Sequence, residues 1–181
     1  MAANLRAAMA CTVTNLAASV GGLTWMLWDY RIEHKWSTVG FCSGAIAGLV
    51  DITPGSGFVG APAAVLFGFM AGTIRNFATQ LKFIFASHAV SGVVGNVLTG
   101  LFAQASVAGF DGITDIPGWL DHNYIQLGYQ LADSIAALSY SFVMTTIILY
   151  IMHYIPFLRM RGSEEAEIMG LDEYDMGGVC V

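Results

Sequence analysis

The sequence predicts an all-α, multi-pass membrane protein whose helices pack as a bundle. Two features of its composition carry this prediction: 56% of the 181 residues are hydrophobic and only 11% are charged. A soluble domain usually has about 25% charged residues. The strict alternation of apolar and polar residues that marks a membrane barrel is missing, which makes helices the expected spanning elements.

Long stretches without Asp, Glu, Lys or Arg mark the spans, because a helix needs about 20 apolar residues to cross the hydrocarbon core. The second of these stretches, residues 36–50, is short, and we expect its helix to continue into "DITPGSG" as an end buried in protein. The last is long enough to tilt or to extend into water. About five spanning helices are predicted in this way, at residues 7–28, 37–53, 57–81, 84–105 and 124–156.

The chain divides into a transmembrane domain, residues 1–156, and an acidic cytoplasmic tail, residues 157–181. A cleaved signal peptide is the alternative for the first span. The apolar run is too long for one, however, and no clear cleavage site follows it. The span starts almost at Met1, which is typical of a chain that begins inside a larger bundle.

Lys and Arg predict the orientation, because they gather on the cytoplasmic side of membrane proteins. When the helix ends are placed alternately, Arg6 falls alone on one side. The other side receives Arg31, Lys35, Arg75, Lys82, Arg159 and Arg161. We therefore expect the N-terminus outside, the acidic loop at 106–123 extracellular, and the tail inside.

Small residues on the second and third spans predict close helix packing. Each span has a GxxxG pair, in "GAIAG" and in "GFMAG", which lets helix backbones approach. The packing glycines are Gly44, Gly48, Gly68 and Gly72.

The fourth span has a polar face with one histidine. His88, Ser91, Gly92, Gly95 and Thr99 follow at i, i+3, i+4, i+7 and i+11, so they share one side of a helix. We expect this side, with His88, to point into the bundle. An ionisable residue within the membrane suggests a functional site, and a neutral imidazole that holds neighbouring helices together is the alternative. The residues alone leave both open.

A similar stripe lies on the first span, at Thr12, Asn15, Ser19 and Gly22. Asp133, near the outer end of the fifth span, is expected to take a structural hydrogen bond. It lies on a different helix from His88 and towards the opposite end, so a membrane-embedded enzyme that uses both is disfavoured.

Sequence motifs of enzymes are missing, including HExxH, a nucleophile elbow and a phosphate-binding glycine loop. The isolated cysteines Cys11, Cys42 and Cys180 do not form a metal-binding pattern. We therefore expect no catalysis, no cofactor or metal, and no nucleic-acid partner.

Two motifs connect the chain to a known family. "GFCSGAIAGLVDITPGSGFVGAPAAVLFGFMAG" (40–72) resembles the signature region of the ammonium transporter family (Amt/Mep/Rh). "SHAVSGVVGNVLTGLFAQ" resembles its later "HGVGGxVGNxLTGxFA" helix. The loop "GFDGITDIPGWLDHNYIQLGYQLADS" and the tail "EEAEIMGLDEYD" look like the fungal members. The resemblance extends over essentially the whole chain.

This resemblance implies a fold and a function. The family has an eleven-helix fold, assembles as trimers and has one pore in each subunit, and this sequence resembles only its last five helices. Two hydrogen-bonded histidines line the apolar pore, where a bare ammonium ion is costly and the neutral amine passes. His88 matches the second histidine. Asn15, Ser91, Gly92, Gly95 and Thr99 are then pore or packing residues.

The resemblance also implies ammonium or ammonia as substrate, the lipid bilayer of the plasma membrane as surroundings, and a homotrimer or association with full-length relatives. It places the partner histidine, a phenylalanine gate and an outer recruitment site on earlier helices. "QLKFIFASH" joins segments that the family separates by about two helical turns. Ala89 and Ser91 replace family glycines. We therefore expect the chain not to conduct alone. The alternative is a non-conducting protein that assembles with full-length ammonium transporters and modulates them.

Overall fold

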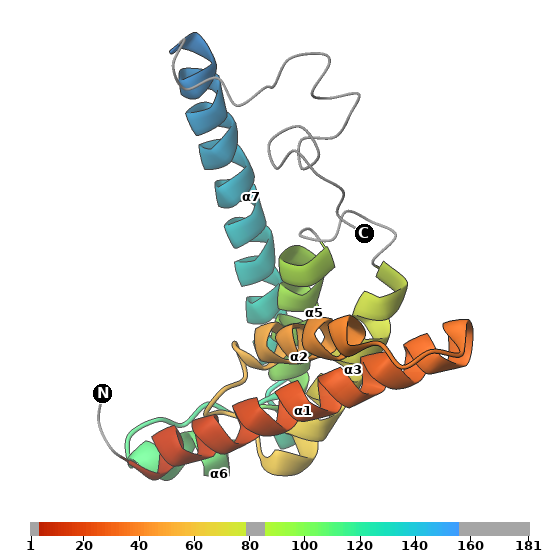
Figure 1. Cartoon of the computed structure of the whole chain (residues 1–181). Coiled ribbons are helices and arrows are strands. Elements are labelled where there is room, and N and C mark those ends of the chain that lie inside the picture. Colours follow the sequence, from red (N-terminus) through yellow and green to blue (C-terminus); the bar gives the residue numbers. More distant parts are fainter. Residues whose placement is uncertain (1–3, 79–85, 156–181) are drawn as a thin grey trace. The chain divides into compact units, whose positions relative to one another are not determined.

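The computed structural model describes residues 4–78 and 86–155, and its regular structure there is helical (Figure 1). The chain divides into two compact units, Met1–Ala136 and Ala137–Val181. The predicted tail, Lys82, and the ends of three predicted spans lie outside the described residues. The elements are α1 Leu5–Glu33, α2 Thr38–Ile52, α3 Ala61–Ala78, η1 Ala86–Val90, α5 Ser91–Phe102, α6 Ala105–Ala108, η2 Gly109–Asp111, η3 Trp119–Asp121 and α7 Ile125–Tyr154.

Side chains that bind backbone amides fix where the first helices begin. Asn4 accepts a hydrogen bond from the Ala7 amide at 2.9 Å, and Ser37 accepts one from the Gly40 amide at 2.8 Å. Both satisfy amides that a helix start leaves without partners. α1 ends at His34, which adopts the left-handed conformation (φ 57°).

The stretch after α2 differs from the prediction. The helix stops at Ile52, and residues 53–59 form turns instead of extending it. Gly57 needs its positive φ of 83° there, a conformation that other residues rarely adopt. The turns are nevertheless packed inside, since Val59 is fully buried. α3 therefore begins at Ala61, later than the predicted start at residue 57.

The described helices differ in their ability to cross a membrane. α1 and α7 are long and apolar enough, and a third span results if His88–Phe102 and Ala105–Asp111, bent by 99°, count as one. α2 has 15 residues, about 22 Å of helix, against a hydrocarbon core of about 30 Å. The last turn of α3 contains the polar Arg75 and Asn76. The helices fall in the five predicted regions. By length and composition alone, however, fewer than five of them qualify as membrane spans.

The α1–α2 contact is made by glycines. Gly44 and Gly48 of α2 lie against Gly21 and Ala17 of α1, and a Cβ at Gly21 would come within 2.6 Å of the Gly44 carbonyl oxygen. A side chain at any of these glycines would force the backbones apart. This is the close approach that a GxxxG pair permits.

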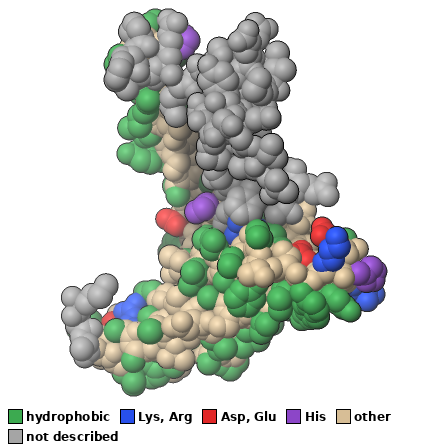
Figure 2. Space-filling view, viewed as in Figure 1, with side chains coloured by type: hydrophobic (Ala, Val, Ile, Leu, Met, Phe, Trp, Pro, Cys, Tyr) green, Lys and Arg blue, Asp and Glu red, His purple; other side chains and the backbone are tan. Residues whose placement is uncertain are grey.

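α3 packs on the same two residues of α1. A Cβ at Gly68 would lie 2.5 Å from the Ala17 carbonyl oxygen, and one at Gly72 would lie 2.7 Å from that of Gly21. One small patch of α1 thus receives glycines from both α2 and α3. Figure 1 shows α2 and α3 beside α1. Beside it lies a core that includes Val13, Ile52 and Phe67. Exposed hydrophobic side chains are also grouped over α1 and α2 on the face shown in Figure 2, as expected for a surface in contact with lipid.

Candidate functional site

The polar face of α5 is divided between a buried part and an open part. Ser91, Gly95 and Thr99 are buried, and the Thr99 hydroxyl donates to the Gly95 carbonyl at 2.8 Å. Gly95 lies against the backbone of Asp51 at the end of α2. Around Gly92, in contrast, a Cβ would meet nothing within 4 Å. The face does not form one continuous lining.

His88 lies in η1, a π-helical turn directly before α5, and its side chain is exposed. The sequence predicted that it points into the bundle, and among the described helices it does not. The π-turn has i→i+5 hydrogen bonds and therefore changes the register between His88 and the buried face of α5. His88 and Gly92 therefore both lie on uncovered parts of the segment formed by η1 and α5.

The stripe on α1 is exposed, with one exception. Thr12, Asn15 and Ser19 are exposed, and each donates to the carbonyl four residues earlier: at 3.0 Å to Ala8, at 3.0 Å to Cys11 and at 2.9 Å to Asn15. These polar groups are therefore satisfied within their own helix, which suits an apolar neighbour. Gly22, predicted in this stripe, instead lies buried against Phe41 of α2.

Asn96 of α5 joins this helix to the start of α7. Its side-chain amide donates to the Asp133 carboxylate at 3.1 Å and to the Ser134 hydroxyl at 3.0 Å. The structural role expected for Asp133 is confirmed by this bond. Asn96 itself was missed, although its spacing of four residues from Gly92 places it at the edge of the predicted polar face. The carboxylate is satisfied by Asn96, not His88, so the two ionisable residues do not form a pair.

Among the residues that the structure describes, two charged side chains are fully buried. Arg75 donates from Nη1 to the Ser43 carbonyl at 3.0 Å, and its guanidinium lies 5.4 Å from the centre of the Trp25 ring. Asp51 has no hydrogen-bond partner for either carboxylate oxygen in the described structure. Arg75 lies in the last turn of α3 and is thus at a helix end; hydrophobic periodicity could not show that its side chain is buried there.

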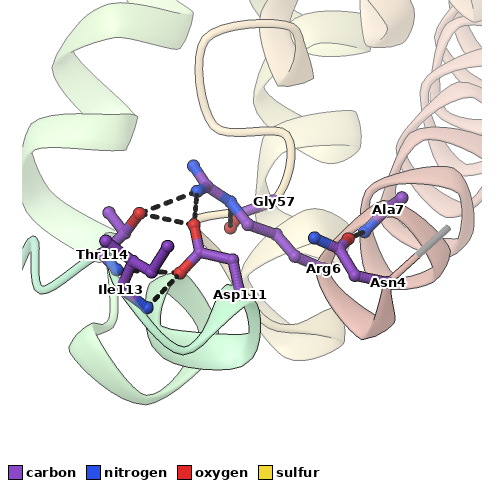
Figure 3. Close-up of polar contacts among 7 residues, drawn as sticks. All are labelled: Asn4, Arg6, Ala7, Gly57, Asp111, Ile113 and Thr114. Atoms are coloured by element: carbon purple, nitrogen blue, oxygen red, sulfur yellow. Dashed lines mark hydrogen bonds and ion pairs between the residues drawn. The ribbon is translucent and has the colours of Figure 1, made fainter. Parts of the chain in front are cut away.

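A network of polar contacts joins the start of α1 to the loop after η2 (Figure 3). Arg6 pairs with Asp111 at 2.5 Å and donates to the Gly57 carbonyl at 3.2 Å. The Thr114 hydroxyl and the amides of Ile113 and Thr114 also donate to the carboxylate. The Thr114 hydroxyl first, then these amides and the guanidinium, hold the pKa of Asp111 well below its usual range. We call Arg6 and Asp111 the terminal clasp.

The described residues contain no group of three or more His, Cys, Asp and Glu side chains that could hold a metal ion. The arrangement instead combines apolar spans, helices joined through glycines, and polar groups that satisfy one another. It defines a helical membrane protein.

Comparison with known proteins identifies the family. The profile of the Ammonium Transporter Family matches residues 1–179. Ammonium transporter 1 of Schizosaccharomyces pombe is 49% identical over 97% of this chain, and ammonium transporter MEP1 of Saccharomyces cerevisiae is 45% identical over 96%. The chain belongs to the Ammonium Transporter Family.

Solved structures agree with this assignment. The crystal structure of Candida albicans Mep2 matches with a TM-score of 0.84 and 50% identity, over 90% of this chain and 38% of that one. Saccharomyces cerevisiae Mep2 matches with the same TM-score, 46% identity, and coverage of 90% and 39%. The chain spans 38% of ammonium transporter 1 and 37% of MEP1, so it corresponds to a part of these relatives.

Proposed function

We propose that this chain is the C-terminal part of a transporter that moves ammonium or ammonia across a membrane, and that His88 lines the pore of the complete protein. The proposal rests mainly on membership of the Ammonium Transporter Family. The exposed His88 and the open space at Gly92 support it, because helices that precede this part in the longer relatives would have a surface to cover there. In low dielectric an imidazole can accept and donate hydrogen bonds to a passing amine.

The same observations favour a chain that does not conduct alone. Polar Thr12, Asn15 and Ser19 are exposed on α1, as is His88 on η1. A pore needs a second wall, and the described helices leave His88 uncovered. A homotrimer of the completed protein, placed in the plasma membrane, is the assembly that we propose.

The proposed orientation places the N-terminus outside and the tail in the cytoplasm. The one predicted outer cation, Arg6, is neutralised by Asp111, whereas Arg31 and Lys35 are exposed at the opposite end of α1. This distribution follows the positive-inside rule. Impermeant thiol reagents should label a cysteine placed at Ile113 from outside whole cells, but not one placed at Lys35. The reverse labelling would overturn the orientation.

The pore role of His88 is testable in a chimera that joins this chain to the preceding helices of Schizosaccharomyces pombe ammonium transporter 1. In yeast without its own ammonium transporters, we expect His88→Ala to abolish or strongly alter uptake. His153→Ala is the control, since that histidine is exposed near the end of α7. Equal uptake by the chimera and its His88→Ala variant would remove the pore role.

A non-conducting partner of full-length transporters is the second candidate. The exposed polar stripe on α1 favours it, because this surface is suited to a neighbouring helix. It predicts that the tagged chain co-purifies with a full-length relative expressed in the same cell. Failure to recover any family member would count against it.

A further inference from the structure

A groove lies between α1 and α3 that the proposed transport path does not use. Its volume is about 250 Å³, and it is lined by Thr24, Leu27, Trp28, Arg31 and Phe69. The first four are spaced as i, i+3, i+4 and i+7 on α1, so they form one side of that helix. The volume is somewhat below the roughly 300 Å³ of the smaller drug-binding pockets, and suits a narrow chain.

Trp28, which lines the groove, is held in place by contacts with α3. The Trp28 indole donates to the Thr73 hydroxyl of α3 at 3.2 Å and packs edge to face against Phe77, with ring centres 5.1 Å apart. An indole fixed at both its polar end and its ring does not have to be ordered when a ligand binds. This lowers the entropic cost of binding.

Apolar surface fills the middle of the groove, and a cation lies at its end. Leu27 and Phe69 are 57% and 48% exposed, too much apolar area to leave to water. Among the described residues, Arg31 has no hydrogen-bond or ion-pair partner, and its side chain is exposed. Beyond it, Tyr30 and Trp36 stack with ring centres 4.3 Å apart, which is typical of the aromatic belt at a membrane interface.

We propose that this groove binds an anionic phospholipid, with an acyl chain along Leu27 and Phe69 and the phosphate on Arg31. The long apolar surface with one unpaired cation at its interfacial end matches the two parts of such a lipid. Anionic phospholipids are concentrated in the cytoplasmic leaflet. That placement rests on the proposed orientation, whereas the binding itself does not.

Fluorescence quenching tests the proposal directly. The 181-residue chain is reconstituted in phosphatidylcholine vesicles with increasing fractions of phosphatidylserine brominated on its acyl chain, and Trp28→Phe identifies the signal of Trp28. We expect brominated phosphatidylserine to quench Trp28 more than brominated phosphatidylcholine does. Arg31→Gln should raise the fraction needed for half-maximal quenching about fivefold. Lys35→Gln, which removes the same charge one turn further on, should leave it unchanged.

Three outcomes would overturn the proposal: equal quenching by both lipids, equal losses in Arg31→Gln and Lys35→Gln, or a phosphatidylserine signal that survives in Trp28→Phe. Protein contacts that fill the groove would appear as the absence of lipid-specific quenching. Both leaflets of these vesicles have the same composition, so a wrong orientation leaves the result unaffected. A failed transport test would likewise leave lipid binding unchanged, which keeps the two proposals separable.

Discussion

Arg6 and Asp111 lie 105 positions apart in the sequence and meet in the terminal clasp. Asp111→Asn keeps the shape but removes the charge, so we expect the thermal midpoint of the detergent-solubilised chain to fall at pH 7. The pKa of Asp111 is lowered by folding, so its contribution is complete above the unfolded value of about 3.9 and is lost as the pH falls below it. Circular dichroism melting curves should give a constant difference between pH 5 and 8 and a smaller one near pH 3. A difference that grows on acidification would contradict this assignment.

Asp51 is fully buried without a partner in the described structure. Because an unsatisfied buried group costs about 1–3 kcal/mol, we expect Asp51→Ala to leave the free energy of unfolding unchanged or to raise it by about 1 kcal/mol after the small cavity is counted. Asp133→Ala is the control: it removes an acceptor of Asn96 and should lower that free energy by about 1 kcal/mol. Unfolding in graded denaturing detergent measures both. Strong destabilisation by Asp51→Ala would show a bonding role that the structure lacks.

At the scale of elements, the glycines of α2 and α3 set the distance to α1. Gly48→Ala puts a methyl group against the backbone of Ala17, so we expect a loss of about 1–3 kcal/mol of stability. Gly92→Ala serves as the comparison, because nothing lies within 4 Å of the added methyl group. Replacing a helical glycine with alanine there should gain up to about 1 kcal/mol. Equal effects of the two substitutions would mean that the α1–α2 contact is looser than described.

Much of the element layout could be predicted from the sequence. Charge-free runs located α1, α2, α3, α5 and α7, because hydrophobicity and helix length are local properties. The turns after Ile52 and the π-turn at His88 could not be read this way, since they depend on packing against other elements. The terminal clasp, the interior place of Arg75 and the Asn96–Asp133 bond also depend on contacts between distant segments, which periodicity does not encode.

At the scale of the whole molecule, the chain accounts for less than half of the relatives it matches. The match to ammonium transporter 1 extends over 187 positions, more than the 181 residues present, so that relative has residues where this chain has none. We therefore expect the uncovered surface around His88 and Gly92 to be covered in the complete protein.

Gly92→Ala is expected to have different effects in the chain alone and in the complete protein. In the chain alone, Gly92→Ala should raise stability by up to about 1 kcal/mol, since the added methyl group meets nothing within 4 Å. In the chimera with the preceding helices of ammonium transporter 1, the same substitution should reduce uptake, because the proposed second wall of the pore would approach this position. Radiolabelled methylammonium uptake by cells, normalised to surface expression, distinguishes the two. Full uptake by the Gly92→Ala chimera would show that no helix approaches Gly92.

The most direct test of the account compares ammonium uptake by proteoliposomes that contain either the chain alone or the chimera. The account predicts uptake by the chimera and none above protein-free vesicles for the chain alone, at equal amounts of helical protein. Uptake by the chain alone would contradict the claim that it is part of a pore that needs further helices.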